Sequence, residues 1–495
     1  MRAKGETHSS SRALLTDLYQ LTMAASYLTA GLEDVDAVFH LYFRDHPFGG
    51  GYAVASGLAA ALEFIETFAF DESDVAYLST LTGNDGRALF TPDALHRLTQ
   101  VKLTVDVDAV VEGTMVFRNE PLLRVTGPIA ACQLLETPLL NLINFPTLVA
   151  TKASRVVLAA AGDPVLEFGL RRAQGPDGGV TASRAAYVGG CAATSNVLAG
   201  KLFGIPVRGT HAHSWVMAFD DEVSAFEAYA EAMPNNVVLL VDTYDTIEGV
   251  AHAIQVARRM RDAGGTLAGI RLDSGDLAAL SKAARAMLDE AGFPEVAILG
   301  SNELDEHVIS SLKDQGAKIS VWGVGTKLVT ADGQPALGGV YKLAAIRKRG
   351  EAWRWRVKVS ESSAKMTDPG VLQVRRFHGA HGSVIGDMIF NAEEPPTEAA
   401  TIVDQDDPTL RATFPADAAF EDLLVPAVRS GRVTYEEPAL PDVRARTLAQ
   451  LALFGPRVTR FLNPQRYPVG LEQELYDLRT RLILETRGFG RREGP

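Results

Sequence analysis

Six short apolar segments between residues 163 and 326 constrain the fold of this chain more than any other feature. Helical patterns at 183–202, 246–263, 276–291 and 305–315 separate most of them. Strands that alternate with helices at this spacing form parallel βαβ units. The pattern therefore predicts a parallel α/β sheet, and six units in succession favour a closed or nearly closed barrel. The predicted strands lie at 165–170, 206–209, 237–241, 268–272, 296–299 and 319–322.

Each of the six segments ends in chemically useful side chains. In parallel α/β folds the active site lies at the carboxyl ends of the strands. We therefore expect these groups to share one site. They are Glu167, Arg171 and Arg172; Thr210 and His213; Asp242 and Thr243; Arg271 and Asp273; Ser301 and Asn302; and Gly323, Gly325 and Thr326.

The segments before and after the barrel are rich in strands and turns. We expect four parts: an N-terminal α+β domain at 1–145, an α/β barrel catalytic domain at 146–344, a strand-rich segment at 345–440 that packs with the N-terminal domain, and a C-terminal helical segment at 441–495. The fold class is therefore α/β, an irregular (β/α) barrel with an α+β domain assembled from the N-terminal and post-barrel segments.

Composition excludes several functions. A formal net charge of −13 argues against a nucleic-acid surface. Cys132 and Cys191 are too few for a disulfide framework, which fits a reducing cytoplasm. No apolar run is long enough to span a bilayer, and Asp17 and Gln20 interrupt what would be the apolar region of a signal peptide. We expect a cytoplasmic protein without a membrane partner.

Arg271 lies inside an otherwise apolar strand, so its guanidinium needs a partner. That partner is either Asp273 or Asp276 within the chain, or the carboxylate or phosphate of a ligand. Asp242, Asp273 and Asp276 could also hold Mg²⁺, which prefers oxygen ligands. Gly323-Val-Gly-Thr326 is typical of an anion-binding loop but equally of a plain turn.

Two histidines occur in Val207-Arg-Gly-Thr-His-Ala-His-Ser214. If this run is a strand, His211 and His213 leave the same face of it. They are packed histidines, metal ligands of the kind found in metal-dependent hydrolase barrels, or a nucleophile or base. Tyr19 lies in a predicted helix at 14–30, where periodicity favours a core role.

A set of motifs spread in order over nearly the whole chain resembles the nicotinate phosphoribosyltransferase family. The motifs are Thr16-Asp-Leu-Tyr-Gln-Leu-Thr-Met23, Phe48-Gly-Gly-Gly-Tyr52, Glu167-Phe-Gly-Leu-Arg-Arg-Ala-Gln-Gly175, Gly209-Thr-His-Ala-His-Ser214, Arg271-Leu-Asp-Ser-Gly-Asp276, Gly323-Val-Gly-Thr326, Asn463-Pro-Gln-Arg-Tyr-Pro-Val-Gly470 and Glu474-Leu-Tyr-Asp-Leu478.

The resemblance implies a type II phosphoribosyltransferase-like fold. It also implies a reaction that joins nicotinate to 5-phosphoribosyl 1-diphosphate with coupled ATP hydrolysis and Mg²⁺, in NAD biosynthesis or salvage. By resemblance, His213 is phosphorylated by ATP, and His211 occupies a variable position.

The resemblance also implies the remaining roles. Arg271 and Asp273 join His213 as catalytic residues. Tyr19, Thr210 and Arg271 bind nicotinate, with Tyr19 supplied by the neighbouring subunit of a homodimer with shared active sites. The phosphoribosyl diphosphate contacts are Arg171, Asp242, Asp273, Gly325 and Thr326, and Asp242 is the expected magnesium ligand.

The chain departs from the family in two places. Many relatives carry lysines after the Pro-Gly near position 370, where this chain has Pro369-Gly-Val-Leu-Gln-Val-Arg-Arg376, so Arg375 and Arg376 could take over a phosphate contact. Lys327 is also variable among relatives. The rival interpretations are a nicotinamide phosphoribosyltransferase, a metal-dependent hydrolase that uses His211 and His213, and a non-catalytic partner-binding descendant.

Overall fold

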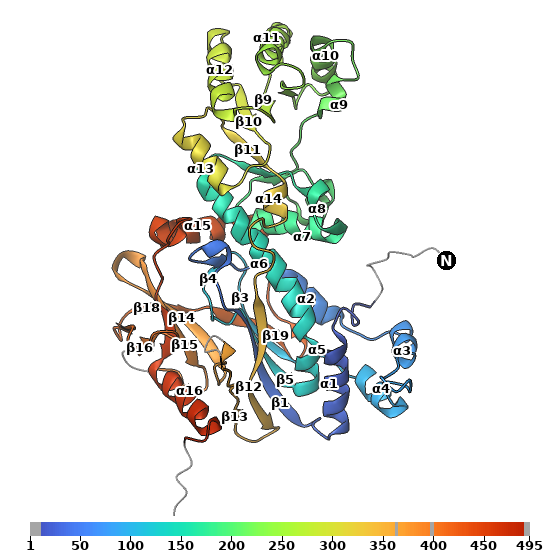
Figure 1. The fold of residues 1–495 in the computed structure, drawn as a ribbon, viewed down its shortest axis with the longest axis vertical. Helices are drawn as coiled ribbons and strands as arrows, with labels where there is room; N and C mark the ends of the chain where they lie inside the picture. The colour runs from blue at the N-terminus through green and yellow to red at the C-terminus, as the bar shows by residue number, and fades with distance from the viewer. Residues whose placement is uncertain (1–10, 362–364, 397–399, 490–495) are drawn as a thin grey trace, which may run out of the picture. The chain divides into compact units, whose positions relative to one another are not determined.

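The computed structural model describes residues 11–361, 365–396 and 400–489, which divide into two compact units. The first unit comprises Met1–Thr147, Ala336–Pro438 and Ala449–Pro495, and the second comprises Leu148–Pro335 and Ala439–Leu448. The first unit is therefore assembled from segments before and after the second, as predicted. Figure 1 shows this in its colours, because blue and orange segments lie side by side in the first unit.

The second unit contains a six-stranded sheet in the order β7-β6-β11-β10-β9-β8. Every neighbouring pair is parallel. In the described part of the chain the edge strands β7 and β8 do not pair with each other, so the predicted irregular barrel is present in incomplete form. The strands are β6 (Val165–Glu167), β7 (Ala193–Thr194), β8 (Val238–Leu240), β9 (Gly269–Leu272), β10 (Ala297–Gly300) and β11 (Val321–Val324).

Helices follow these strands, and aspartates fix where three of them begin. Asp245, Asp276 and Asp305 each accept backbone N–H groups of the first turn of α11, α12 and α13. Such N-caps satisfy donors that have no partner within the helix. The helices are α7 (Gly175–Val188), α8 (Val197–Phe203), α9 (His213–Val216), α10 (Glu222–Ala232), α11 (Thr246–Asp262), α12 (Leu277–Glu290), α13 (Glu306–Asp314) and α14 (Thr326–Val329), with a 3₁₀ turn η2 (Leu170–Arg172).

Two predicted elements of the barrel were wrong. The expected strand at 206–209 forms only one isolated bridge, between Val207 and Thr194. The expected helix at 183–202 is interrupted, because α7 ends at Val188 and the short strand β7 precedes α8. As a consequence, His211 and His213 do not leave one face of a strand: His211 lies in a loop, and His213 begins α9.

The first unit is built on two larger sheets and a two-stranded ribbon, β2-β4. One sheet has the order β13-β12-β1-β5-β3-β19-β20, and the other β17-β16-β21-β15-β14-β18. The pairs are antiparallel except β15 with β21. The strands are β1 (Val35–Phe43), β2 (Ala53–Val54), β3 (Asp106–Val110), β4 (Met115–Val116), β5 (Leu123–Pro128), β12 (Gly339–Lys348), β13 (Arg354–Trp355), β14 (Leu372–His378), β15 (Val384–Asn391), β16 (Ala400–Val403), β17 (Arg411–Phe414), β18 (Ala419–Asp422), β19 (Leu424–Arg429), β20 (Arg432–Val433) and β21 (Val469–Glu472).

Helix α1 buries Leu21, Ala24 and Ala25 in a core shared with α3, α4 and α5. Helices α6 and α15 contain residues of both units. The helices with residues in the first unit are α1 (Leu18–Thr29), α2 (Leu58–Thr67), α3 (Glu72–Ser79), α4 (Pro92–Thr99), α5 (Ile129–Leu134), α6 (Glu136–Ala159), α15 (Leu440–Thr459) and α16 (Gln473–Thr486), with 3₁₀ turns η1 (Pro47–Gly49) and η4 (Ala380–Gly382).

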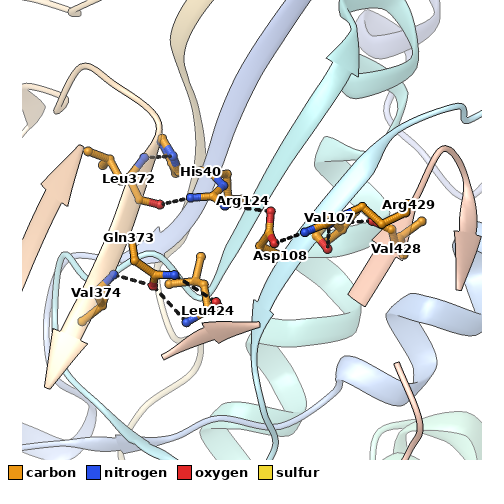
Figure 2. Close-up of polar contacts among 10 residues, drawn as sticks. All are labelled: His40, Val107, Asp108, Arg124, Leu372, Gln373, Val374, Leu424, Val428 and Arg429. Atoms are coloured by element: carbon orange, nitrogen blue, oxygen red, sulfur yellow. Dashed lines mark hydrogen bonds and ion pairs between the residues drawn. The ribbon is translucent and has the colours of Figure 1, made fainter. Parts of the chain in front are cut away.

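Buried polar contacts join the two large sheets (Figure 2). The N–H of Leu372 in β14 donates to Nε2 of His40 in β1 at 3.1 Å. Arg124 in β5 donates to the carbonyl oxygen of Leu372 at 2.8 Å and to Asp108 at 2.8 Å. Burial, together with the charge of Arg124, lowers the pKa of His40 to about 3. His40 is therefore neutral at physiological pH, as its role as acceptor requires.

A second buried network surrounds Arg376. Its guanidinium donates to Asp387 at 2.6 Å and to the carbonyl oxygen of Met115 at 2.9 Å, and both side chains of the ion pair are fully buried. Arg375 pairs with Asp422 and packs on Phe420. Both arginines are thus held within the first unit, which argues against the suggested phosphate contact for them.

Within the described ranges, no helix is both long enough and apolar enough to cross a membrane.

Candidate active site

Arg271 lies on β9 with its guanidinium partly buried. Its Nη1 donates to the hydroxyl of Thr210 at 2.5 Å. Its Nε is buried and has no hydrogen-bond acceptor among the described residues. Burial lowers the pKa of Arg271, while the charges of Asp273 and Asp242 oppose this shift. A carboxylate or phosphate that reached Nε would complete the hydrogen bonding of this group.

Neither Asp273 nor Asp276, the two partners considered within the chain, forms an ion pair with Arg271. Asp276 accepts the N–H of Ala279 and caps α12, and Asp273 accepts the hydroxyl of Ser301 at 2.5 Å. The guanidinium pairs with neither of them within 4 Å in the described structure. Of the two alternatives for Arg271, the geometry favours a ligand.

Thr210 also lines an apolar cavity of about 450 Å³. Leu166, Leu299 and Val321, from three neighbouring strands, contribute to its wall. A cavity of this size and character suits a small aromatic molecule whose polar group is held at the rim.

Asp242 directly follows the last buried residue of the β8 segment. Its Oδ2 accepts the N–H of Asp273 at 2.9 Å and the hydroxyl of Ser274 at 2.6 Å. Its Oδ1 is buried and has no partner in the part of the chain that the structure describes. A buried carboxylate oxygen without a donor is costly unless a cation or a ligand reaches it. Asp242 therefore fits the expected magnesium ligand.

His213 stands at the first position of α9, with about 40% of its side chain exposed. Its Nδ1 lies 3.2 Å from the hydroxyl of Thr243, and its Nε2 lies 3.8 Å from Oδ2 of Asp273. Because Nδ1 is engaged, Nε2 is the nitrogen left for chemistry. Thr243 was expected at the end of a strand, but no role could be predicted for it from the sequence. Its contact with His213 depends on the residue at which α9 begins.

His211 is a packed residue in the structure. Its Nε2 accepts the N–H of Leu240 at 3.2 Å, and its Nδ1 lies 3.3 Å from the carbonyl oxygen of Ala212. Its ring packs at 4.8 Å from that of Tyr229. Burial lowers the pKa of His211, which keeps the ring neutral. Both ring nitrogens contact backbone groups, so His211 could bind a metal ion only if one of these contacts were lost.

Two glycine-containing loops, which follow β6 and β11, also border the site. A Cβ on Gly169 would come within 2.5 Å of Val329, and one on Gly325 within 3.1 Å of the carbonyl oxygen of Phe168. The loop that carries Arg171 therefore packs closely on the loop that carries Gly325 and Thr326. Arg171 is exposed, and its charge contributes to lowering the pKa of Arg271.

Glu167 was expected among the side chains that share the site, but it is fully buried. Its carboxylate accepts the hydroxyls of Ser183 at 2.9 Å and Thr194 at 2.6 Å and the N–H of Gly169. Glu167 therefore holds the loop after β6 in place rather than facing a ligand.

Tyr19 belongs to α1 of the first unit and is 48% exposed. The periodicity of apolar residues in this segment favours a core position for Tyr19, and that prediction is wrong. Its exposure leaves the ring available to a second chain, and its place beside nicotinate stays a prediction about the assembled dimer.

The carboxyl edge of the parallel sheet thus brings together an arginine without a full set of acceptors, a hydroxyl, two carboxylates and an accessible histidine. The fold and this group of side chains are those of an α/β enzyme, with the candidate active site at that edge.

Comparison with known proteins identifies the family. Residues 14–144 match the nicotinate phosphoribosyltransferase N-terminal domain, residues 165–368 the nicotinate phosphoribosyltransferase family, and residues 372–479 the nicotinate phosphoribosyltransferase C-terminal domain. The chain is 42% identical over 481 residues to the nicotinate phosphoribosyltransferase of Bacillus subtilis, covering 96% of both chains. It is 36% identical over 534 residues to that of Homo sapiens, covering 96% of this chain and 97% of the relative.

Solved structures agree. The crystal structure of human nicotinic acid phosphoribosyltransferase matches with a TM-score of 0.80 and 34% identity, covering 95% of this chain and all of that one. The nicotinate-nucleotide pyrophosphorylase of Pyrococcus furiosus shares the fold, with a TM-score of 0.67 at 22% identity, covering 89% of this chain and 95% of that one. The chain belongs to the nicotinate phosphoribosyltransferase family of pentosyltransferase enzymes. The predicted family and fold class are thereby confirmed.

Proposed function

We propose that this protein forms nicotinate mononucleotide and diphosphate from nicotinate and 5-phosphoribosyl 1-diphosphate, as a step of NAD biosynthesis. The observation that carries this proposal is the guanidinium of Arg271. Its buried Nε has no acceptor among the described residues, and its Nη1 donates to Thr210, which lines an apolar cavity. A nicotinate carboxylate at Arg271 with its ring in the cavity uses both features.

The carboxylates and arginines suit the transfer of the ribosyl group. When diphosphate leaves C1, positive charge develops on the ribose and negative charge on the leaving group. In this proposal Asp273 stabilises the ribose charge, and Arg171 stabilises the leaving group. The pyridine nitrogen is unprotonated at neutral pH, so its lone pair attacks C1 without a general base.

Magnesium fits this site as an ion bound together with the substrate. No group of three His, Cys, Asp or Glu side chains suited to a metal ion occurs among the described residues. Mg²⁺ is commonly held by one or two carboxylates together with substrate phosphates. Oδ1 of Asp242 is the available protein ligand, and a bound ion would neutralise charge on the departing diphosphate.

We further infer that ATP is a co-substrate and that His213 carries the phosphoryl group. The lone pair of Nε2 would attack the γ-phosphorus, the bond to the bridging oxygen would break, and ADP would leave. The new phosphate would stand close to Asp273, only 3.8 Å from Nε2, and like charges there raise the demand for a cation. Phosphorylation would thereby strengthen the binding of magnesium and phosphoribosyl diphosphate.

The working assembly in this proposal is a homodimer in which Tyr19 of one chain completes the nicotinate site of the other. Two exposed apolar side chains close to it in sequence, Leu15 before α1 and Leu18 at the start of α1, support a contact surface there. A reducing cytoplasm fits the two cysteines, which are both buried thiols.

Mononucleotide formation tests the proposal. Purified protein is given phosphoribosyl diphosphate and Mg²⁺ with nicotinate or nicotinamide, each with and without ATP. We expect product from nicotinate, accelerated by ATP. Product from nicotinamide instead would reassign the substrate, and no product from either in folded protein would reject the activity.

A further inference from the structure

Side-chain contacts join four neighbouring loops at the carboxyl edge of the parallel sheet. Asp242, after β8, accepts the N–H of Asp273, after β9, at 2.9 Å. The hydroxyl of Ser301, at the end of β10, donates to Oδ1 of Asp273. Lys327, in α14 after β11, donates to Oδ2 of Asp305 at 2.8 Å, and Asp305 ends the loop after β10. Lys327 therefore makes the last contact of a continuous series along this edge.

The loop between β10 and α13 has an unusual backbone. Asn302 and Glu303 have φ values of 89° and 41°, in the left-handed region, although neither is a glycine. Both are exposed, whereas Ser301 and Leu304 are buried. Left-handed backbone is uncommon outside glycine, persists only where the surrounding structure holds it, and is enriched at active sites and ligand clamps. The loop is thus fixed at its two ends and strained between them.

Asp305 divides its two carboxylate oxygens between neighbouring helices. Its Oδ1 accepts the N–H groups of His307 and Val308 and so caps α13, while its Oδ2 accepts from Lys327. The side chain of Asp305 is 12% exposed and that of Lys327 is 27% exposed. Partial shielding from solvent makes such a pair stronger than a fully exposed one. The ion pair therefore ties the start of α13 to the start of α14.

Both ends of this loop adjoin groups expected to bind phosphoribosyl diphosphate. Thr326, an expected contact of that substrate, directly precedes Lys327 in α14. At the other end, the loop holds the carboxylate of Asp273. The expected nicotinate contacts Arg271 and Thr210 are bonded to each other instead. A change at Lys327 should therefore reach the phosphoribosyl side of the site and spare the nicotinate side.

We propose that Lys327 is a positioning residue for the phosphoribosyl diphosphate site. Through Asp305 it holds the loop at 301–305 in its left-handed conformation, and it fixes the adjacent Thr326 against the same edge. The substrate then meets a site that is already formed, whereas without this ion pair part of the binding energy is used to order the loop. The role rests on the transferase function proposed above.

Substitutions of Lys327 test this role by steady-state kinetics. Lys327→Met removes the ammonium but keeps much of the side-chain length. We expect the KM for phosphoribosyl diphosphate to rise about fivefold and the KM for nicotinate to change less than about twofold. Lys327→Arg can still pair with Asp305 and should restore most of the loss. Lys313→Met breaks an ion pair of similar exposure, with Asp163, and is the matched control that should change neither constant.

A double-mutant cycle separates the ion pair from a general loss of structure. Asp305→Asn keeps an oxygen that can cap α13 but loses the charge that pairs with Lys327. If the two residues act as a pair, the double variant should have nearly the same KM for phosphoribosyl diphosphate as Lys327→Met alone. Fully additive increases would show that Lys327 does not act through Asp305 and would overturn the proposal.

Hydrogen exchange without substrate gives a readout that does not depend on turnover. The amides of His307 and Val308 donate to Asp305, so they should exchange faster in Lys327→Met and return towards the wild-type rate in Lys327→Arg. Unchanged exchange in Lys327→Met, or an unchanged KM for phosphoribosyl diphosphate in an active enzyme, would overturn the role of Lys327. A wild-type protein that forms no mononucleotide would instead reject the transferase proposal itself.

Discussion

In the guanidinium of Arg271, one nitrogen donates to Thr210, and another is buried and has no acceptor in the part of the chain that the structure describes. An unsatisfied buried donor costs about 1–3 kcal/mol, which an arriving carboxylate recovers. Arg271 could be identified as a candidate binding residue from the sequence, because a charged side chain inside an apolar strand is unusual. The sequence could not exclude Asp276 as its partner, since the capping role of Asp276 depends on the residue at which α12 begins.

Arg271→Ala should raise the KM for nicotinate by roughly 100-fold, because hydrogen bonds to a charged group contribute about 1.5–3 kcal/mol. The KM for ATP should change far less. Initial-rate kinetics with each substrate varied in turn measure both constants. A larger effect on ATP than on nicotinate would contradict the carboxylate-binding role.

His213→Ala should abolish ATP consumption, because Nε2 is the nitrogen left for phosphorylation. Slow synthesis of mononucleotide without ATP should remain, since the nicotinate site is intact. ADP release and product formation are measured in parallel. His211→Asn is the comparison at the neighbouring histidine, and wild-type ATP consumption in His213→Ala would reject the phosphohistidine.

At the scale of elements, patterns of apolar residues were sufficient for the longer helices and the central strands. Strands β8, β9 and β10 and helices α11, α12 and α13 lie within two residues of their predicted bounds. The two-residue strand β7 was missed, because a strand this short has no periodicity to detect. The buried ion pair of Arg376 in β14 could not be predicted from the sequence either. Arg375 and Arg376 point in opposite directions, and which one faces inward depends on the packing of the two sheets.

Arg376→Met should lower the free energy of unfolding by about 3–5 kcal/mol, because it leaves the carboxylate of Asp387 buried without its partner. Arg375→Met is the matched control on the same strand. Its ion pair with Asp422 is partly exposed, so we expect a loss of about 1 kcal/mol or less. Urea unfolding followed by circular dichroism measures both, and equal losses would contradict the assigned importance of the buried pair.

Acid should weaken the hydrogen bond between Leu372 of β14 and His40 of β1, because protonated His40 cannot accept it. The pKa of His40 is about 3 in the folded protein against 6.5 in the unfolded chain, so only the unfolded chain binds a proton between these values. Stability is therefore retained above pH 6.5 and lost as the pH falls. Between pH 7 and pH 5 this residue should lower the free energy of unfolding by about 2 kcal/mol.

Hydrogen exchange of the Leu372 amide at the two pH values measures this change. His40→Gln offers an acceptor that does not titrate, so the pH dependence of Leu372 protection should decrease by the same amount. An unchanged pH dependence in this variant would show that other groups are responsible.

At the scale of the whole molecule, the order of the motifs along the chain was enough to predict an assembled α+β domain and the family. The incomplete closure of the barrel was not predictable, because whether edge strands pair depends on their length and on the residues opposite them. The proposed dimer likewise depends on surfaces that a single sequence does not define.

Mixed dimers test the shared site. Tyr19→Ala and Arg271→Ala proteins, each inactive or nearly so, should regain activity when they are mixed and allowed to exchange subunits. A hybrid dimer contains one site with both residues intact, so up to about one quarter of wild-type activity per site is expected from random exchange. Mass spectrometry verifies that hybrids form, and hybrids without regained activity would show that each site is built from one chain.

The discontinuous first unit also has a consequence for synthesis on the ribosome. Strand β1 pairs along its length with β12, but residues 44–338 separate the two strands. At ordinary translation speeds of about 5–20 residues per second, β1 waits roughly 15–60 s for this partner. Most of the second unit emerges during that interval and can fold first. An apolar strand with one open edge is therefore exposed in every nascent chain until β12 emerges, and during that time its unpaired N–H and C=O groups are open to pairing with another chain.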